Sequence, residues 1–368
     1  MSLIMEQKQG NARLVLKFVR ESPLSRAELS RKTGLTRAAI TGIVDSLVSE
    51  GLLREGTTEK TSMGRRPTML ELVPEAYYSV GIDIARDGVR LCVLDFTMQA
   101  VFERFWGNEI ESETVLFEMG ETVRTLKKQY RFLGAGVVSP GPVDSVNGKI
   151  LEPDGLDAWH NFSIDKLSGL LELDVILQKD TAALAIAEKR FIGADKSFLV
   201  LLADHGLGSG FIYKGELFES AFGFGSEIGH ISIDLNGEKC SCGNRGCAEL
   251  YASIPSALKA ARAFKPDIIW SELAQSDDDR YRKILKKQAE ALALVCVNAI
   301  NMLEPEVIVL EGDLCLGYEL FKENIESIIS ERCFTKAGRG VKIISSVLGQ
   351  NARAFSAANL VYEKYFGR

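Results

Sequence analysis

The chain has 368 residues, enough for two or three domains with buried cores, and its 46% hydrophobic and 26% charged content is ordinary for a globular protein. No apolar run approaches the roughly 20 residues of a membrane span, and the first residues lack the apolar core of a secretory signal, so we expect a cytoplasmic protein without a membrane partner. Residues 1–70 hold 12 Lys/Arg against 7 Asp/Glu, whereas the remainder holds 32 against 43. A basic head on an acidic body indicates that the head contacts nucleic acid.

Residues 1–74 are predicted to form a winged helix-turn-helix domain. Apolar residues recur at helical spacing over 11–20, and Ser25-Arg-Ala-Glu28 is a capping-box pattern that opens a second helix. A glycine turn at Gly34 then precedes a longer helix, and the stretch 51–56 is typical of the first strand and turn of a wing. The alternative is a three-helix protein-interaction domain, which the basic charge of this region disfavours.

The start of the third helix carries small or basic side chains, which can enter a major groove without repelling phosphates. An arginine pair follows in a polar loop stiffened by Pro67, an arrangement suited to a narrow A·T-rich minor groove; the alternative is a solvated basic linker. The residues predicted to contact DNA are Ser25, Arg26, Thr36, Arg37, Ala38, Ala39, Thr41, Arg65 and Arg66.

Two related α/β lobes are predicted after the head. The first spans 75–190 and is completed by a C-terminal helix at 352–368, and the second spans 191–351. A meander of three strands begins at residue 78, and a second meander begins about 120 residues later, which suggests internal duplication. The predicted strands of the meanders are 78–85, 89–96, 100–107, 198–203, 208–213 and 216–218, and the main predicted helices are 114–130, 181–191, 282–303 and 352–366.

Metal-ligand residues gather between positions 225 and 253. Three thiolates and one imidazole form a set that Zn²⁺ takes tetrahedrally. Glu227 and Glu249 flank this set, and a metal that ties the loop down would hold both carboxylates in fixed positions. A disulfide is the alternative, but the cytosolic character of the rest of the chain disfavours it. The four predicted ligands, called here the His/Cys cluster, are His230, Cys240, Cys242 and Cys247.

The spacing Glu-x-x-His followed by Cys-x-Cys-Gly-x-x-Gly-Cys-x-Glu resembles the signature of the ROK family, which comprises repressors, open reading frames and sugar kinases. The resemblance covers about residues 11–366. It implies an α/β protein with an N-terminal winged helix-turn-helix followed by a two-lobed actin-like, ribonuclease-H-like sugar kinase fold with a cleft between the lobes. It also implies sugar contacts, called here the sugar-site residues, at Gly141, Lys179, Asp180, Glu227, His230 and Glu249.

The turns that bind ATP in the family's kinases are altered in this chain. Where the kinases have a phosphate-binding turn, this chain carries Asp87, and their adenosine-binding Gly-Gly-Gly appears here as Glu311-Gly312-Asp313. These acids would repel the phosphates, so we predict that the protein is not a kinase. A further turn keeps Gly208 and Gly210, which serve either an anion site or a tight hairpin.

Two of the sugar-site residues have alternative roles. Asp180 matches the position of the kinase base and could accept hydrogen bonds from sugar hydroxyls, or it could cap the helix that starts at Thr181. Lys179 replaces the family's asparagine. A cation there favours an altered ligand, such as an anionic sugar or sugar phosphate, unless the lysine simply pairs with Asp180.

We therefore predict a sugar-responsive transcriptional regulator, in the sense of a repressor of carbohydrate-metabolism genes. It would bind operator DNA as a homodimer or dimer of dimers, carry Zn²⁺, and take a sugar or sugar-phosphate effector in the inter-lobe cleft. The enzymatic alternative is a ROK-type ATP-dependent sugar kinase with an appended DNA-binding head. A third hypothesis is a DNA binder that senses no ligand and whose body serves only for dimerisation.

Overall fold

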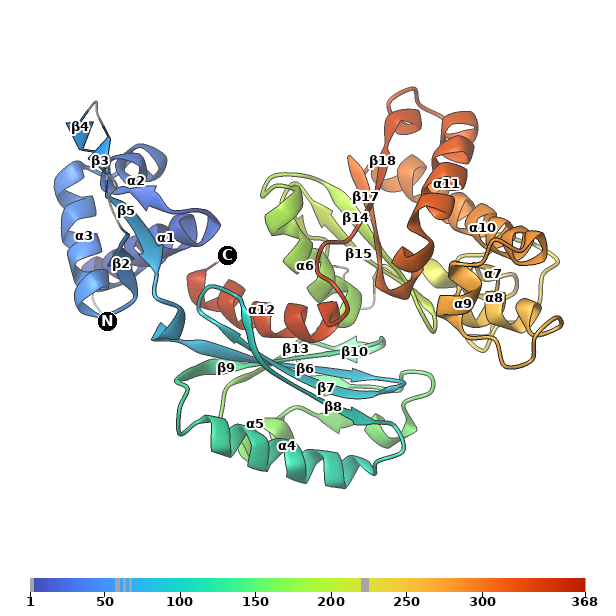
Figure 1. Cartoon of the computed structure of the whole chain (residues 1–368), viewed down its shortest axis with the longest axis horizontal. Coiled ribbons are helices and arrows are strands. Elements are labelled where there is room, and N and C mark those ends of the chain that lie inside the picture. The colour runs from blue at the N-terminus through green and yellow to red at the C-terminus, as the bar shows by residue number, and fades with distance from the viewer. Residues whose placement is uncertain (1–2, 57–59, 62–63, 66–67, 220–224, 368) are drawn as a thin grey trace. The chain divides into compact units, whose positions relative to one another are not determined.

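The computed structural model describes residues 3–56, 60–61, 64–65, 68–219 and 225–367 (Figure 1). The chain divides into two compact units. The first comprises 1–138, 163–177 and 357–368, and the second comprises 139–162 and 178–356. Among the described residues, no helix is both long enough and apolar enough to cross a membrane.

The described residues of the head, at the start of the first unit, form three helices and a small antiparallel sheet of order β1-β5-β2. The predicted capping box is present at Ser25 and Glu28, and Gly34 ends the second helix with a φ of 72°, a left-handed conformation that glycine adopts without strain. Ile40 and Val44 of the third helix are fully buried in the core of the head. The elements are α1 (Leu3–Glu21), α2 (Arg26–Thr33), α3 (Arg37–Ser49), β1 (Leu24–Ser25), β2 (Leu53–Glu55), β3 (Lys60–Thr61), β4 (Gly64–Arg65) and β5 (Met69–Leu72).

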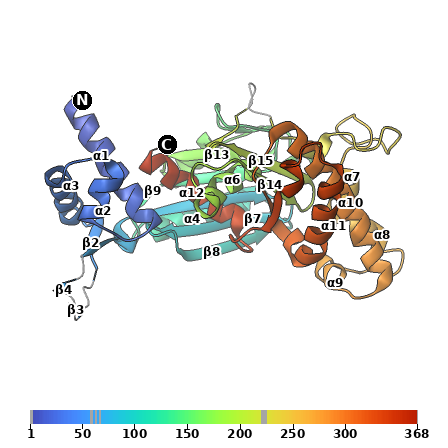
Figure 2. The same cartoon turned by 90° about the horizontal axis from the view of Figure 1, so that it is seen from above.

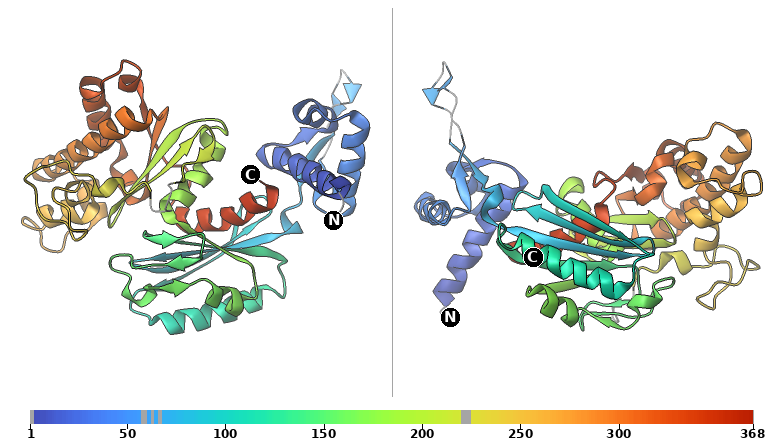
Figure 3. Two further views of the ribbon diagram at one scale, coloured as in Figure 1. Left: turned by 180° about the vertical axis from the view of Figure 1, so that it is seen from behind. Right: turned by 60° about the horizontal axis from the view of Figure 1, so that its bottom comes forward.

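The rest of the first unit is built on a five-stranded sheet of order β13-β9-β6-β7-β8. The helices α4 and α5 cover one face, and the C-terminal helix α12 lies on the other (Figure 1, Figure 3). Gly136 permits this close approach, because a Cβ there would lie 1.8 Å from the carbonyl oxygen of Ala357 in α12. The elements are β6 (Tyr78–Ala85), β7 (Gly88–Asp95), β8 (Ala100–Gly107), α4 (Ser112–Leu126), β9 (Phe132–Ser139), α5 (Asp165–Leu171), β13 (Val175–Lys179) and α12 (Ala352–Phe366).

Helix α12 also contacts the head. The Arg20 guanidinium, in the last turn of α1, lies 2.6 Å from a carboxylate oxygen of Glu363 and 4.8 Å from the centre of the Phe366 ring. Nearby, the Tyr362 hydroxyl donates to the carbonyl oxygen of Asp95 at the end of β7, at 2.7 Å. Helix α12 therefore contacts both the head and the sheet of the first unit.

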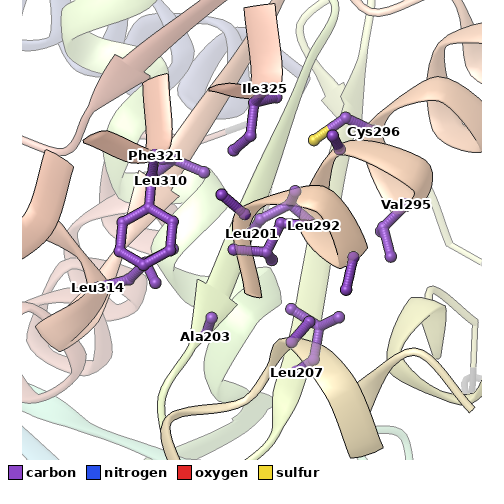
Figure 4. Close-up of a cluster of buried hydrophobic side chains, with 14 of the residues drawn as sticks. Leu201, Ala203, Leu207, Leu292, Val295, Cys296, Leu310, Leu314, Phe321 and Ile325 are labelled. Atoms are coloured by element: carbon purple, nitrogen blue, oxygen red, sulfur yellow. The ribbon is translucent and has the colours of Figure 1, made fainter. Parts of the chain in front are cut away.

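The second unit repeats the plan with a five-stranded sheet of order β16-β15-β14-β17-β18. Side chains of β14 alternate, as a strand buried on both faces requires. Leu199 and Leu201 face α10 and α11, which lie side by side, whereas Phe198 and Val200 pack with residues of α6 (Figure 1, Figure 2). Figure 4 shows Leu201 among side chains of α10 and α11. The elements are α6 (Asp180–Ile192), β14 (Phe198–Ala203), β15 (Leu207–Tyr213), β16 (Glu216–Leu217), α10 (Asp279–Leu303), β17 (Val307–Glu311), α11 (Tyr318–Arg332) and β18 (Lys342–Ser345).

Helix α6 belongs to the second unit, although the sequence prediction assigned it to the first lobe. The reason lies in the two glycines of β15. A Cβ at Gly210 would lie 2.1 Å from the carbonyl oxygen of Thr181, and one at Gly208 would lie 2.8 Å from the Thr181 methyl group. These glycines therefore let the start of α6 rest on the strand, which favours the packing role over the anion-binding alternative.

Short elements connect the main ones and were not predicted from the sequence. They are η1 (Pro74–Ala76), β10 (Val143–Asp144), β11 (Lys149–Ile150), η2 (Asp157–Trp159), β12 (Phe162–Ser163), η3 (Ile228–His230), α7 (Glu249–Ala252), α8 (Ile254–Ala261), α9 (Trp270–Ala274), η4 (Gly312–Gly317) and η5 (Gly338–Gly340).

Candidate functional site

The His/Cys cluster lies after β16, where η3 and the following loop bring its four donor atoms within 4.8 Å of one another. The Cys240 sulfur lies 3.8 Å from His230 Nδ1, and the Cys242 and Cys247 sulfurs lie 3.6 Å apart. A tetrahedral site with metal–sulfur bonds of about 2.3 Å places its ligands about 3.8 Å apart, whereas a disulfide joins sulfurs at about 2.05 Å. The spacing therefore fits a metal and excludes a disulfide in this conformation.

Local hydrogen bonds hold the cluster in place. The Asn244 side chain donates to the carbonyl oxygen of His230 at 3.0 Å, and the Asn244 carbonyl accepts from the Cys240 amide at 2.8 Å. Burial raises the pKa of the Cys247 thiol to about 12, so at neutral pH its thiolate needs a bound cation. Sequence reasoning missed Asn244, which lies inside the Cys-Gly-x-x-Gly-Cys turn.

Three sugar-site residues, Gly141, Lys179 and Glu227, lie together in the second unit. Their arrangement corrects the expected ion-pair partner of Lys179. The Lys179 ammonium pairs with Glu227 Oε1 at 2.7 Å, and not with Asp180 as the alternative proposed. The Lys179 side chain is 11% exposed and that of Glu227 is 40% exposed, so the pair reaches from the interior to the surface. Gly141 lies against it, because a Cβ at that position would be 3.0 Å from the same Glu227 oxygen.

The turn before Glu227 is held by two serines that sequence reasoning missed. Ser226 has a φ of 68°, which is uncommon for a residue with a side chain. Its carbonyl oxygen accepts from the Ser209 hydroxyl at 2.9 Å and lies 3.5 Å from the Lys179 ammonium. The only available signal was the position of Ser209 between the two glycines of β15.

The remaining sugar-site residues also lie in the second unit. Asp180 is buried and is the first residue of α6, so Lys179 and not Asp180 occupies the N-cap position; one Asp180 oxygen still accepts from the Thr181 amide at 2.6 Å. Glu249 begins α7 and accepts from the Leu207 amide at 3.0 Å. Gly229 of η3 approaches the Leu207 carbonyl, so the start of β15 contacts both η3 and the side chain of Glu249.

The acids at the altered nucleotide turns are not exposed, unpaired charges as the sequence suggested. In the first unit, Asp87 pairs with the Arg90 guanidinium at 3.0 Å, and this guanidinium lies 4.4 Å from the centre of the Phe105 ring. In the second unit, Glu311 is buried and accepts from the Gly312 amide, and burial raises its pKa to about 7. Asp87 is therefore a paired acid in the first unit, and Glu311 is a buried acid in the second.

The head presents only some of the predicted DNA contacts. Arg37, Ala38, Ala39 and Thr41 are exposed at the start of α3, and the exposed Thr36 caps that helix by accepting from the Ala39 amide. This exposure is what the prediction required.

Other predicted DNA contacts are engaged elsewhere. Ser25 is buried and its hydroxyl serves the capping box, and Arg26 pairs with Asp45 at 2.7 Å and Glu55 at 3.0 Å. Both residues therefore serve the fold of the head. Arg65 lies in β4, and Arg66 lies outside the described residues.

The chain thus combines a winged helix-turn-helix head with two five-stranded mixed sheets, one in each unit. Residues 79–364 match the ROK family, and the chain belongs to it. The chain is 30% identical over 374 residues to the xylose repressor of Bacillus subtilis, covering 97% of this chain and 96% of the relative. It is 23% identical over 363 residues to the DNA-binding transcriptional dual regulator NagC of Escherichia coli, covering 93% and 89%.

Solved structures agree with this fold. A ROK family transcriptional regulator, a homolog of the Escherichia coli MLC protein, matches with a TM-score of 0.79 and 24% identity over 98% of this chain and 96% of that chain. A ROK family glucokinase from Streptomyces griseus, in complex with glucose and AMPPNP, matches with a TM-score of 0.68 and 22% identity over 77% and 98%. The match to the regulator structure covers nearly the whole chain, whereas the match to the kinase structure covers only part of it.

Proposed function

We propose that this protein is a sugar-responsive transcriptional repressor of carbohydrate-metabolism genes that acts in the cytoplasm. The observation that carries the proposal is the 30% identity to a xylose repressor, which extends over head and body alike. The glucokinase match extends over only 77% of this chain. A transcriptional regulator needs a DNA-binding domain such as this head, whereas sugar phosphorylation does not.

The head would bind operator DNA through the exposed start of α3. Its small side chains and the single cation of Arg37 are compatible with a major groove, and the charge of the head attracts phosphates. Arg65 and Arg66 would contact the flanking minor groove. A homodimer or dimer of dimers would place two heads on two half-sites.

Zn²⁺ would be held by His230, Cys240, Cys242 and Cys247. The donor set and the donor spacing support this assignment. A bound zinc ion would supply structural bracing, with no role in a reaction. It would fix η3 and the loop that leads to α7, and so hold Glu227 and Glu249 where sugar hydroxyls can donate hydrogen bonds to their carboxylates.

Sugar binding to the second unit would shift the population of conformations that hold operator DNA. The experiment uses an operator selected from a random-sequence DNA pool and measures binding of the full chain by gel shift. D-xylose, D-glucose and N-acetyl-D-glucosamine, and the 6-phosphates of the last two, are added in turn. We expect one of them to change the operator affinity at least about tenfold. No change with any sugar or sugar phosphate would refute the proposal, and so would ADP release at ordinary kinase rates.

A further inference from the structure

We propose that Lys179 is a specificity-determining residue that makes the sugar site select an uncharged sugar and reject sugar phosphates and sugar acids. This inference rests on the proposed function, because it names the chemical class of the effector for the same site. The sequence alone allowed a sugar or a sugar phosphate as effector, and a cation at position 179 favoured the anionic ligand. The structure favours the uncharged sugar instead.

The Lys179 ammonium is already engaged by acceptors of this chain. It pairs with Glu227 Oε1 at 2.7 Å and lies 3.5 Å from the carbonyl oxygen of Ser226. With 11% of its side chain exposed, the ammonium depends on these acceptors for the solvation that it has lost. Its backbone is held as well, because the Lys179 amide donates to the Gln178 side chain, which in turn accepts from Ser145.

A ligand phosphate could reach Lys179 only at the expense of this pair. If the ammonium turned to a phosphate, Glu227 would lose its cation and would face the incoming anion at close range. Breaking one partner from a partly buried pair is costly, and placing a like charge beside the remaining carboxylate adds to that cost. The engaged lysine therefore does not act as an anion receptor.

The formal charge of the sugar-site residues points the same way. Three of the six carry carboxylates, at Asp180, Glu227 and Glu249, and one carries an ammonium. An anionic ligand would therefore enter a site whose net charge has its own sign.

An uncharged sugar fits without breaking the pair. A carboxylate offers about four lone-pair positions, so Glu227 can hold Lys179 and still accept from sugar hydroxyls at its half-exposed end. The ammonium has three protons, and two are directed at Glu227 and Ser226, which leaves one for a sugar oxygen. Gly141 provides the space, because a Cβ there would crowd both Glu227 and the Lys179 stem.

The test is isothermal titration calorimetry on the full-length, metal-loaded protein. The probes are D-glucose, D-xylose and N-acetyl-D-glucosamine, each compared with charged counterparts: D-glucose 6-phosphate, D-glucuronate and N-acetyl-D-glucosamine 6-phosphate. We expect the best uncharged sugar to bind at least about tenfold more tightly than any charged probe. Equal or tighter binding of a charged probe would overturn the inference and leave the proposed function standing. Absence of binding by every probe, with operator affinity unchanged, would overturn the proposed function itself.

Two variants sharpen the test. Glu227→Gln releases Lys179 from its carboxylate, so the preference for uncharged over charged probes should fall at least about tenfold. Lys196→Met serves as the matched control, because Lys196 also pairs with a glutamate in the same unit, Glu306 at 2.6 Å, but lies in an exposed pair. It should leave the preference unchanged. An unchanged preference in Glu227→Gln, with its zinc content intact, would contradict the role assigned to Lys179.

Discussion

Two carboxylates of the second unit, Glu227 and Glu311, differ in their exposure to solvent and in the groups that surround them. Glu227 is 40% exposed and has its own lysine at 2.7 Å. Glu311 is buried, and burial outweighs the attraction of Arg353 and raises its pKa to about 7. Glu227 thus keeps an exposed surface for hydrogen bonds at the proposed sugar site, whereas Glu311 is enclosed at the altered nucleotide turn.

The largest effect is expected from removing a ligand of the His/Cys cluster. Cys242→Ser should release most of the metal, because three ligands hold zinc far less tightly than four, and the loop that leads to Glu249 should loosen. Metal content per chain, measured by elemental analysis, should fall by about tenfold or more. The control is Cys315→Ser, because the Cys315 thiol bonds to the Leu310 carbonyl outside the cluster. A Cys242→Ser protein that stays fully metallated and still responds to sugar would contradict the proposed role of the cluster in holding the sugar site.

A second test addresses Glu311. Its pKa of about 7 in the folded chain exceeds the ordinary value of 4.5, so its contribution to stability is complete below about pH 4.5 and is lost as pH rises through about 7. Ser346, Glu188 and Arg353 face it, and burial also raises the pKa of Glu188. Glu311→Gln should therefore gain up to about 3 kcal/mol relative to the wild type between pH 5 and pH 8.

Urea unfolding at the two pH values measures this gain. Glu306→Gln is the control, since Glu306 is an exposed acid of the same unit whose pKa is lowered by Lys196. It should not gain stability as the pH rises. A Glu311→Gln effect of the same size at both pH values would mean that Glu311 ionises normally and that the two carboxylates are alike.

The joint between the head and α12 provides a third test. Arg20 and Glu363 form a pair whose side chains are only 10% and 19% exposed, and the Phe366 ring lies against the guanidinium. Arg20→Ala should cost about 2 kcal/mol in thermal unfolding of the first unit. Arg124→Ala removes an exposed pair with Glu121 and should cost less than about 0.5 kcal/mol. If Arg20→Ala cost no more stability than Arg124→Ala, the contact between Arg20 and α12 would contribute no more than an ordinary exposed ion pair.

The smallest effect is expected in the head. Arg37→Ala should weaken operator binding by about 1–2 kcal/mol with a change in base preference, because Arg37 is exposed at the start of α3. Arg65→Ala should mainly affect operators with A·T-rich flanks. Fluorescence anisotropy with operator and random DNA separates the two. Equal losses on random DNA for both variants would contradict these roles.

Much of this fold was predictable because local patterns determine it. The strand periodicity that begins at residue 78 predicted β6 and β7 within one residue of their observed ends, and the Ser25–Glu28 spacing predicted the capping box. The His/Cys cluster was predictable because its ligand types are distinctive. Helix α11 and strand β18 were missed because neither has a pattern that separates it from its neighbours.

The partners of individual side chains were not predictable, because they depend on packing between distant segments. Lys179 and Glu227 are 48 residues apart, and only the folded unit shows that they pair. Arg26 carries the charge expected of a DNA contact, but the fold brings Asp45 and Glu55 to it. Glycine pairs in β15 have the same sequence pattern whether they serve an anion or a helix, and Thr181 decides between these roles.

The most direct test of the account compares sugar-induced release of operator DNA in the wild type and in Glu227→Ala, followed by fluorescence anisotropy. We expect both proteins to bind the operator equally without sugar. An uncharged sugar that releases the wild type should then leave Glu227→Ala bound. Release of both proteins at the same sugar concentration would contradict a pocket built around the Lys179–Glu227 pair.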